Sequence, residues 1–203
     1  MSTFIFRNST LESLFSNSGE IIFSDYDGIH LKDYNYDNYI WFYTLPLKYN
    51  HQNLITEVND YKKRLNIIAS NIPEDKMFIL FTLESVGSIR FEDSNLDLKN
   101  TIYEFNNFLQ ELSRKHKNIK LVDFSLFLKN YSEKKIIDWR YYFLSKAIIN
   151  PKLSLEFNLW FDNKFNSILQ KRKKCLVLDL DNTLWGGILG EDGIEGIKLN
   201  ENY

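Results

Sequence analysis

The stretch from Tyr39 to Thr44 reads YIWFYT, and the stretch from Lys76 to Thr82 reads KMFILFT. Both runs are apolar almost throughout and lack the alternation of polar side chains seen in strands with one solvated face. Such runs are typical of parallel strands that helices cover on both faces. We therefore predict one buried strand over 39–44, ended by Pro46, and a second over 76–82.

The sequence on either side of these runs alternates between short apolar stretches and helical patterns. Apolar residues recur every three to four positions between Gln52 and Ser70, which predicts a long amphipathic helix there. Further strands are expected over 3–6, 20–24 and 119–123, and further helices around 98–112, 124–130, 140–148 and 153–170. Residues 1–170 are thus predicted to form one three-layer α/β domain. Its five-stranded, mainly parallel sheet should have flavodoxin-like topology or a close variant.

Bulk properties exclude several classes of protein. The 203 residues carry a net charge of −2 and give a pI near 6.0, without the basic footprint of a nucleic-acid binder. A single cysteine excludes an internal disulfide and a cysteine-based metal site. We find no signal peptide and no apolar run near the roughly 18–20 residues that span a bilayer, so we expect a cytoplasmic protein without membrane or nucleic-acid partners.

A second pattern follows the basic run Lys171–Lys174, where we place a domain boundary. The apolar residues Cys175–Leu178 run directly into Asp179-Leu180-Asp181-Asn182-Thr183. A buried strand would deliver Asp179 to its carboxyl end, and Asp181 would emerge beside it. One carboxylate can then attack phosphorus while the other handles the leaving-group proton. Mg²⁺ would offset the repulsion between these anions and the phosphate.

This loop resembles motif I of the haloacid dehalogenase (HAD) superfamily. The following residues, Leu184–Ile194 (LWGGILGEDGI), resemble the branch found in FkbH-like proteins. The resemblance implies that Asp179 is the nucleophile and a Mg²⁺ ligand. It implies that Asp181 is the general acid/base and a second Mg²⁺ ligand, and that Thr183 stabilises the phosphate-binding loop. The alternative interpretation is a strand followed by a turn rich in Asp and Asn.

The remaining HAD residues lie well downstream in that superfamily: a Ser/Thr, a Lys/Arg and a further acidic pair. Roughly 20 residues after one strand are too few to build a Rossmann-like domain with its own core. We therefore expect residues 171–203 to be the N-terminal fragment of a HAD-like domain, and the chain by itself not to be a competent phosphatase.

In FkbH-like proteins the HAD domain follows a domain similar to the SGNH (GDSL-type) hydrolases, and residues 1–170 fit that position. The predicted first strand ends in Arg7-Asn8-Ser9-Thr10, where SGNH enzymes carry their nucleophilic serine. By resemblance Ser9 is the candidate nucleophile, with Asn8 beside it as a substrate-binding residue. A helix beginning here would aid an oxyanion through its positive N-terminal end. Alternatively, Ser9 or Thr10 only caps that helix.

The SGNH family supplies its base from a late Asp-x-x-His motif. The matching place reads Asp138-Trp139-Arg140-Tyr141, so a tyrosine stands where histidine is expected. Neutral tyrosine is a poor base near pH 7, which leaves the serine-hydrolase set incomplete. Arg140, Tyr141, Tyr142 and Lys146 could instead line an anionic pocket; alternatively, the residues from Tyr141 to Leu144 are core. The three histidines lie elsewhere and are expected at the surface: His30, His51 and His116.

Three functions remain open. The resemblance implies a full-length protein that uses phosphoryl chemistry while loading a phosphorylated three-carbon acid onto an acyl carrier protein, in polyketide or polysaccharide biosynthesis. The second possibility is a non-catalytic module that binds a carrier protein or an acyl group. The third is an esterase or acyltransferase that uses Ser9. Two more features are expected near a site: Glu84 and Ser85 at a strand end, and the acidic, tyrosine-rich loop 25–38.

Overall fold

The computed structural model describes residues 2–15, 20–31, 34–47, 51–86, 93–169, 183, 185–196 and 198. The chain divides into two units, Met1–Ile168 and Leu169–Tyr203. The described strands are β1 (Ser2–Arg7), β2 (Glu20–Tyr26), β3 (Asn38–Phe42), β4 (Met77–Phe81) and β5 (Ile119–Val122). The described helices are α1 (His51–Asn71), α2 (Asp93–Lys115), α3 (Ser125–Leu128), α4 (Glu133–Ile136), α5 (Trp139–Ser145), the 3₁₀ turn η1 (Pro151–Leu153), α6 (Ser154–Leu169) and α7 (Leu189–Gly196).

The first unit contains one five-stranded sheet in the order β2-β1-β3-β4-β5, and each neighbouring pair of strands is parallel. The predicted α/β class, the five strands and the flavodoxin-like topology are confirmed. The strand order reverses at β1, because the chain pairs β2 on one side of it and then β3 on the other. In open α/β sheets, the crevice beyond the strand ends at such a reversal is the usual place for a ligand.

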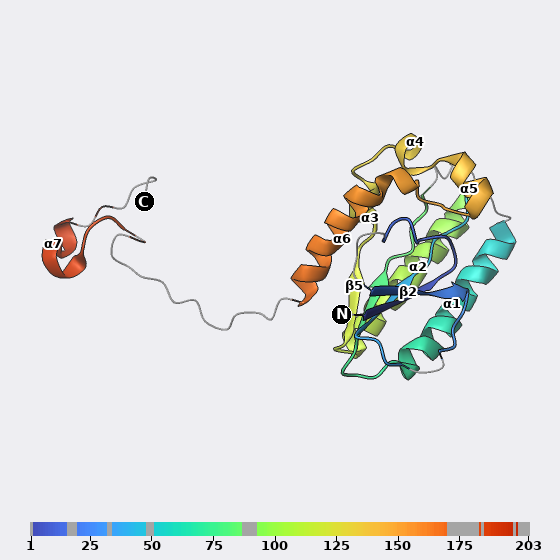
Figure 1. Ribbon diagram of the computed structural model, residues 1–203, viewed down its shortest axis with the longest axis horizontal. Helices are drawn as coiled ribbons and strands as arrows, with labels where there is room; N and C mark the ends of the chain where they lie inside the picture. The colour runs from blue at the N-terminus through green and yellow to red at the C-terminus, as the bar shows by residue number, and fades with distance from the viewer. Residues whose placement is uncertain are drawn as a thin grey trace. The chain divides into compact units, whose positions relative to one another are not determined.

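Helices cover both faces of the sheet, with α1 and α2 on one side and α3 and α6 on the other (Figure 1). Successive residues of each strand point to opposite faces, so Trp41 joins the core under α1 and α2 while Phe42 joins the core under α6. Both side chains are fully buried. The uninterrupted apolar strands seen in the sequence follow directly from this double coverage.

The segment after β1 differs from the prediction. Residues 8–15 form bends and turns, and the helix expected to open at Ser9 or Thr10 is absent from them. The Ser9 hydroxyl, which could have capped a helix, is instead hydrogen-bonded to the Thr44 hydroxyl just beyond the end of β3. Phe15 is buried, and its ring packs 5.0 Å from that of Phe157 in α6. Tertiary packing outweighs the local helix signal, so these residues offer no helix end to an oxyanion at Ser9.

In the second unit, the structure describes a compact turn and helix after the aspartate loop. Gly186 and Lys198 form an antiparallel bridge with two backbone hydrogen bonds of 2.9 Å, and α7 lies between them in sequence. Thr183 lies in an exposed turn. The predicted strand 175–178, Asp179 and Asp181 all lie outside the described residues.

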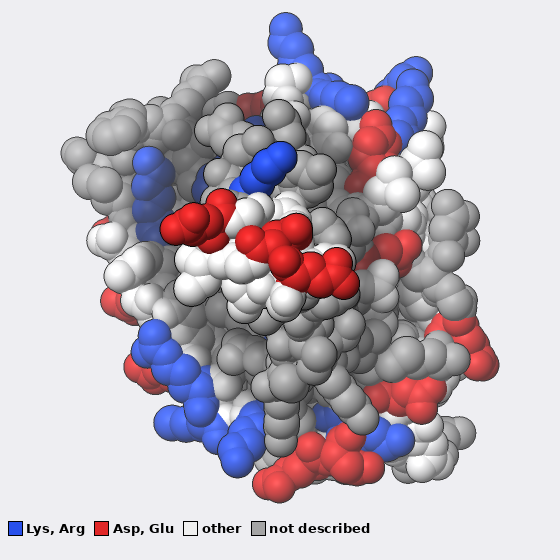
Figure 2. Space-filling view, turned by 90° about the vertical axis from the view of Figure 1, so that its left-hand side faces the viewer, with Lys and Arg blue, Asp and Glu red and all other residues white. Residues whose placement is uncertain are grey.

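Figure 2 shows both basic and acidic side chains, with several acidic side chains gathered above the centre of the view. No helix within the described ranges combines the length and apolar character needed to cross a membrane.

Candidate ligand site at the ends of β1 and β3

The candidate site begins at the strand-order reversal, where Asn8 and Ser9 follow β1 and Thr44 lies just beyond β3. The Asn8 side chain makes two hydrogen bonds with the backbone of Thr44. Its Nδ2 donates to the Thr44 carbonyl at 2.8 Å, and its Oδ1 accepts from the Thr44 N–H at 2.9 Å. The Ser9 and Thr44 hydroxyl oxygens lie 2.8 Å apart and are buried. Side-chain bonds thus extend the pairing of β1 and β3 past the end of the sheet.

A second branch of this network leads to α1. Asn8 Nδ2 also donates to the Tyr61 hydroxyl at 3.0 Å, and Tyr61 donates to Glu57 Oε1 at 2.8 Å. Burial, together with the hydrogen bond to Glu57 and its negative charge, raises the pKa of Tyr61 far above its usual range. Tyr61 therefore stays a neutral donor at physiological pH. Both amide hydrogens and the oxygen of Asn8 are engaged, so Asn8 holds the loop in place rather than offering a free group to a substrate.

Four members of this network border a cavity of about 250 Å³: Asn8, Ser9, Thr44 and Glu57. Its walls are formed by Asn8, Ser9, Asp27, Thr44, Pro46, Glu57, Tyr142, Lys146 and Ile148. The Asp27 carboxylate pairs with Arg64 at 2.6 Å, so its charge is already balanced. Lys146 forms no ion pair with any described residue. Lys146, which is exposed, thus shares the cavity wall with hydroxyl groups and with the Glu57 carboxylate.

Two of the residues around the cavity have a backbone conformation that side chains rarely adopt. Asp27 has φ of 59° and Lys146 has φ of 55°, and within the described ranges they are the two non-glycine residues with positive φ. Such a conformation costs about 1 kcal/mol or more for a residue with a Cβ. Strain of this kind gathers at functional sites. Both residues line the same cavity, which makes it the candidate functional site of this unit.

The surroundings of Ser9 do not provide a base for nucleophilic catalysis. The partner of its hydroxyl is the Thr44 hydroxyl, which cannot accept a proton at neutral pH. None of the described residues around the cavity is a histidine, and His30 and His116 lie exposed elsewhere. An activated serine needs an adjacent base that is itself oriented by a third group. Among the described residues, neither a histidine nor a carboxylate is hydrogen-bonded to the Ser9 hydroxyl.

Helix α5 separates the predicted site residues into two groups. Asp138 caps the helix by accepting from the Arg140 N–H at 3.0 Å, and its carboxylate pairs with the Arg140 guanidinium at 3.1 Å. Neither residue lines the cavity, nor does Tyr141, whereas Tyr142 and Lys146 of the same segment do. The alternative that 141–144 is core is wrong for Phe143 and Leu144, which are 64% and 83% exposed because one face alone of this short helix turns inward.

An ion pair closes the loop that carries Asn8 and Ser9. The guanidinium of Arg7 lies 2.6 Å from the Glu12 carboxylate, between the rings of Phe23 and Tyr26 at 5.0 and 4.6 Å. Arg7 Nε also donates to the Ser24 carbonyl at 3.0 Å. Burial raises the pKa of Glu12, but its backbone hydrogen bond and Arg7 outweigh that effect, so the net pKa lies below its ordinary value.

We expect Glu12→Gln to lower the free energy of unfolding at pH 7 by about 1 kcal/mol, a value that allows for the half-exposed carboxylate. A lowered folded-state pKa stabilises the protein above the unfolded value of 4.5 and loses that effect as pH falls through the folded value. The free energies of unfolding of wild type and Glu12→Gln, measured with urea, should therefore become equal in acid. Asp60→Asn, which breaks the exposed Asp60–Lys63 pair, is the matched control and should change little at either pH. An equal deficit for Glu12→Gln at both pH values would contradict this role.

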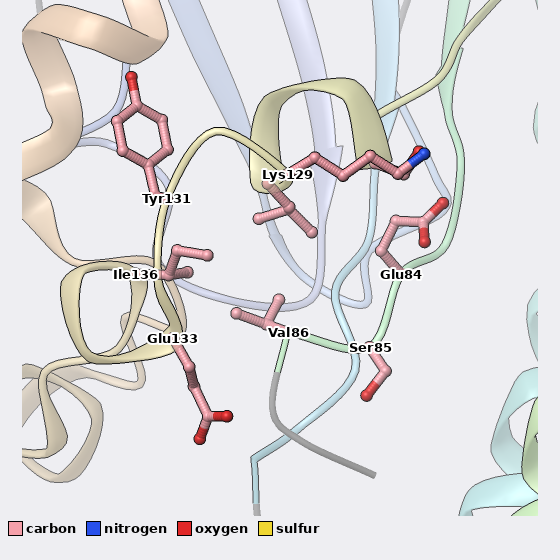
Figure 3. A pocket seen from close by; sticks show the side chains of 9 residues that line it. Glu84, Ser85, Val86, Lys129, Tyr131, Glu133 and Ile136 are labelled. Atoms are coloured by element: carbon pink, nitrogen blue, oxygen red, sulfur yellow. The ribbon is translucent and has the colours of Figure 1, made fainter.

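A second hollow of about 350 Å³ lies beyond β4 and β5, where the sequence pointed to Glu84 and Ser85. Figure 3 shows Glu84 and Lys129 on one side of it and Glu133 on the other. Thr82 donates to Glu84 Oε1 at 2.8 Å, but burial has the larger effect and raises the pKa of Glu84. This hollow is open, and its charges are mixed. It does not share a wall residue with the Ser9 cavity.

Comparison with solved structures gives one informative match. The chain resembles the N-terminal part of the protein BF1531 from Bacteroides fragilis, which contains a phosphatase domain and was crystallised with Mg, with a TM-score of 0.62 at 18% identity. The match covers 99% of this chain and 61% of that one, so the present chain spans under two thirds of its relative. A putative platelet activating factor from Streptococcus pneumonia matches with a TM-score of 0.46 at 13% identity, over 80% of this chain and 82% of that one. No family model and no curated protein matches the sequence.

The described residues contain no group of three or more His, Cys, Asp or Glu side chains placed to hold a metal ion. The two aspartates predicted to bind Mg²⁺ lie outside those residues.

Proposed function

We propose that this chain is the N-terminal part of an FkbH-like enzyme of the HAD superfamily, and that its SGNH-like first unit is a non-catalytic module that binds a small anionic substrate. One observation carries the second half of this proposal. The buried Ser9 hydroxyl is hydrogen-bonded to Thr44 and to no base among the described residues, while Lys146, which has no ion-pair partner among those residues, lines the same cavity.

Two findings support the phosphoryl-transfer half. The residues Asp179 to Thr183 carry the spacing of a HAD nucleophile loop. The fold match spans nearly the whole chain and concerns a protein whose crystallised part contains a phosphatase domain with Mg. In this proposal Asp179 and Asp181 hold Mg²⁺, which would neutralise phosphate charge. Asp179 would form the aspartyl-phosphate, and Asp181 would move the leaving-group proton.

The binding module would hold the substrate by charge and hydrogen bonds. Lys146 would bind its carboxylate or phosphate as a mobile point charge. Glu57, which already accepts from Tyr61, would accept from a substrate hydroxyl. A phosphorylated three-carbon acid fits this set, and an acyl carrier protein in the cytoplasm remains the proposed acceptor. Arg140 and Tyr141 lie outside the cavity wall, so we assign them no direct role in this binding.

Ester hydrolysis tests whether Ser9 is catalytic. We expect the wild-type chain and Ser9→Ala to release p-nitrophenol from p-nitrophenyl acetate at the same background rate, because Ser9 has no base. The Lys146→Arg variant serves as a matched control for nonspecific reaction at the cavity's amine. Turnover at least about 100-fold above background that disappears in Ser9→Ala would match a general-base contribution and would overturn the proposal in favour of an esterase.

A further inference from the structure

The hydroxyl of Thr10 joins three segments beside the Ser9 cavity without lining it. Thr10 Oγ1 lies 2.8 Å from the Tyr26 hydroxyl at the end of β2. The same oxygen donates its proton to the Ser145 carbonyl, the last carbonyl of α5. A hydroxyl that donates once to a carbonyl must accept in its other bond, so Tyr26 donates to Thr10. The chain of bonds runs from Tyr26 through Thr10 to Ser145, one residue before Lys146.

Helix α5 packs against the core under α6 through Tyr142. It is seven residues long, and none of its side chains is fully buried. Its N-terminal end is fixed by the Asp138 cap. Immediately after Lys146 the chain becomes buried again at Ala147, Ile148 and Ile149. Lys146 is therefore the junction between a lightly anchored helix and an anchored segment.

The left-handed conformation of Lys146 needs restraint from both sides of that junction. With φ at 55°, a lysine relaxes toward the extended or right-handed regions unless its neighbours prevent it. The buried residues from Ala147 onward hold one side. The Lys146 N–H bond to the Tyr142 carbonyl at 2.9 Å and the Thr10 bond to Ser145 hold the other. The Thr10 bond is therefore one of the restraints on the end of α5, directly before the cavity-wall residue Lys146.

We infer that Thr10 is a positioning residue for ligand binding, because its hydroxyl fixes the end of α5 and so holds Lys146 over the Ser9 cavity. This inference rests on the proposed anion-binding role of that cavity. It differs from the role suggested by the sequence, in which Thr10 caps a helix. The chemistry concerned is recognition of a carboxylate or phosphate group by Lys146.

Amine labelling with inorganic phosphate as the probe tests the inference. Trinitrobenzenesulfonate modifies exposed lysines, and peptide mass spectrometry reports each site separately. In the wild-type chain, phosphate should slow modification of Lys146 and leave Lys63, exposed on α1, unaffected. In Thr10→Val the phosphate concentration that half-protects Lys146 should rise about fivefold, the size expected for one lost hydrogen bond. Thr10→Ser keeps the hydroxyl and should protect as wild type does.

The outcomes distinguish anion binding at the Ser9 cavity from the positioning role of Thr10. Wild-type Lys146 without phosphate protection would overturn anion binding at the cavity itself. Protection in the wild type that is unchanged in Thr10→Val, or lost in Thr10→Ser, would overturn the positioning role alone. Thermal melting checks that the variants are folded. If Thr10→Val unfolds, Tyr26→Phe removes the donor to Thr10 from an exposed ring and should weaken protection in the same direction.

Discussion

Replacing Asn8 by alanine is expected to lower the free energy of unfolding by about 3 kcal/mol, because the substitution leaves several polar groups without partners. Asn8 satisfies the Thr44 N–H, the Thr44 carbonyl and the Tyr61 hydroxyl oxygen. An alanine can replace none of these bonds, and each orphaned group that stays away from water carries its own cost. Urea unfolding followed by circular dichroism measures the loss directly.

The protein contains a matched control for this experiment. Asn106 on α2 makes the same two-way contact with Leu83, just beyond β4: its Oδ1 accepts from the Leu83 N–H at 2.8 Å and its Nδ2 donates to the Leu83 carbonyl at 3.0 Å. Asn106→Ala should destabilise the fold by a similar amount but leave phosphate binding unchanged, since Asn106 does not line the Ser9 cavity. A loss below about 1 kcal/mol for Asn8→Ala would show that the network does not hold this loop.

Lys146→Gly should separate stability from binding. Glycine adopts the left-handed conformation without a Cβ clash and is the residue most often found just after a helix. We therefore expect the free energy of unfolding to stay the same or to rise by up to about 1 kcal/mol. The affinity for phosphate should fall by about tenfold or more, because a charge-assisted hydrogen bond is lost. Titration calorimetry and urea unfolding give the two values independently.

Lys146→Arg is the control for this prediction, because it keeps the charge and the Cβ clash. It should retain measurable phosphate binding and the wild-type stability, with some loss of affinity because guanidinium and ammonium groups place their donors differently. A Lys146→Gly variant that binds phosphate as wild type does would show that the cavity's cation has no part in binding. A destabilised Lys146→Gly would show that the left-handed conformation is not strained.

The sheet could be predicted because its signal is continuous in sequence. Strands such as β3 and β4 are apolar through almost their whole length. The apolar residues of α1 and α2 recur every three to four positions, as expected for one buried face of a helix. The helix expected at Ser9 is absent because tertiary contacts, which cannot be seen in the sequence, override the local signal for a helix cap. Buried contacts of Phe15 with α6 outweigh that local preference.

The site was predicted less completely. Ser9 and Lys146, both named from the sequence, line the cavity. Glu57 lines it from α1, which is distant in sequence, and Tyr61 of the same helix bonds to Asn8; nothing local in the sequence marks either residue. Thr44 could have been found from its place directly beyond an apolar strand, where α/β folds gather their ligands. The left-handed Lys146 gives no sequence signal, because glycine or asparagine is the residue expected in that conformation.

The Ser9 cavity combines features of two different kinds of site. Its place at the reversal of strand order and its serine after β1 are typical of an enzyme, whereas the Asn8 side chain and the Ser9 hydroxyl are engaged in hydrogen bonds within the protein. A binding module that keeps the position of an active site but not its base accounts for both. The phosphoryl chemistry would then belong to the aspartate loop that follows.

A phosphate titration of the 203-residue chain, followed by ¹H–¹⁵N NMR, tests binding at this cavity most directly. We predict saturable chemical-shift changes at the amides of Ser9, Thr44 and Lys146, with one dissociation constant for all three. The resonances of Glu84 and Lys129, at the second hollow, should stay in place. Unchanged resonances around Ser9, or saturable shifts confined to the second hollow, would contradict the assignment of the Ser9 cavity as the anion-binding site.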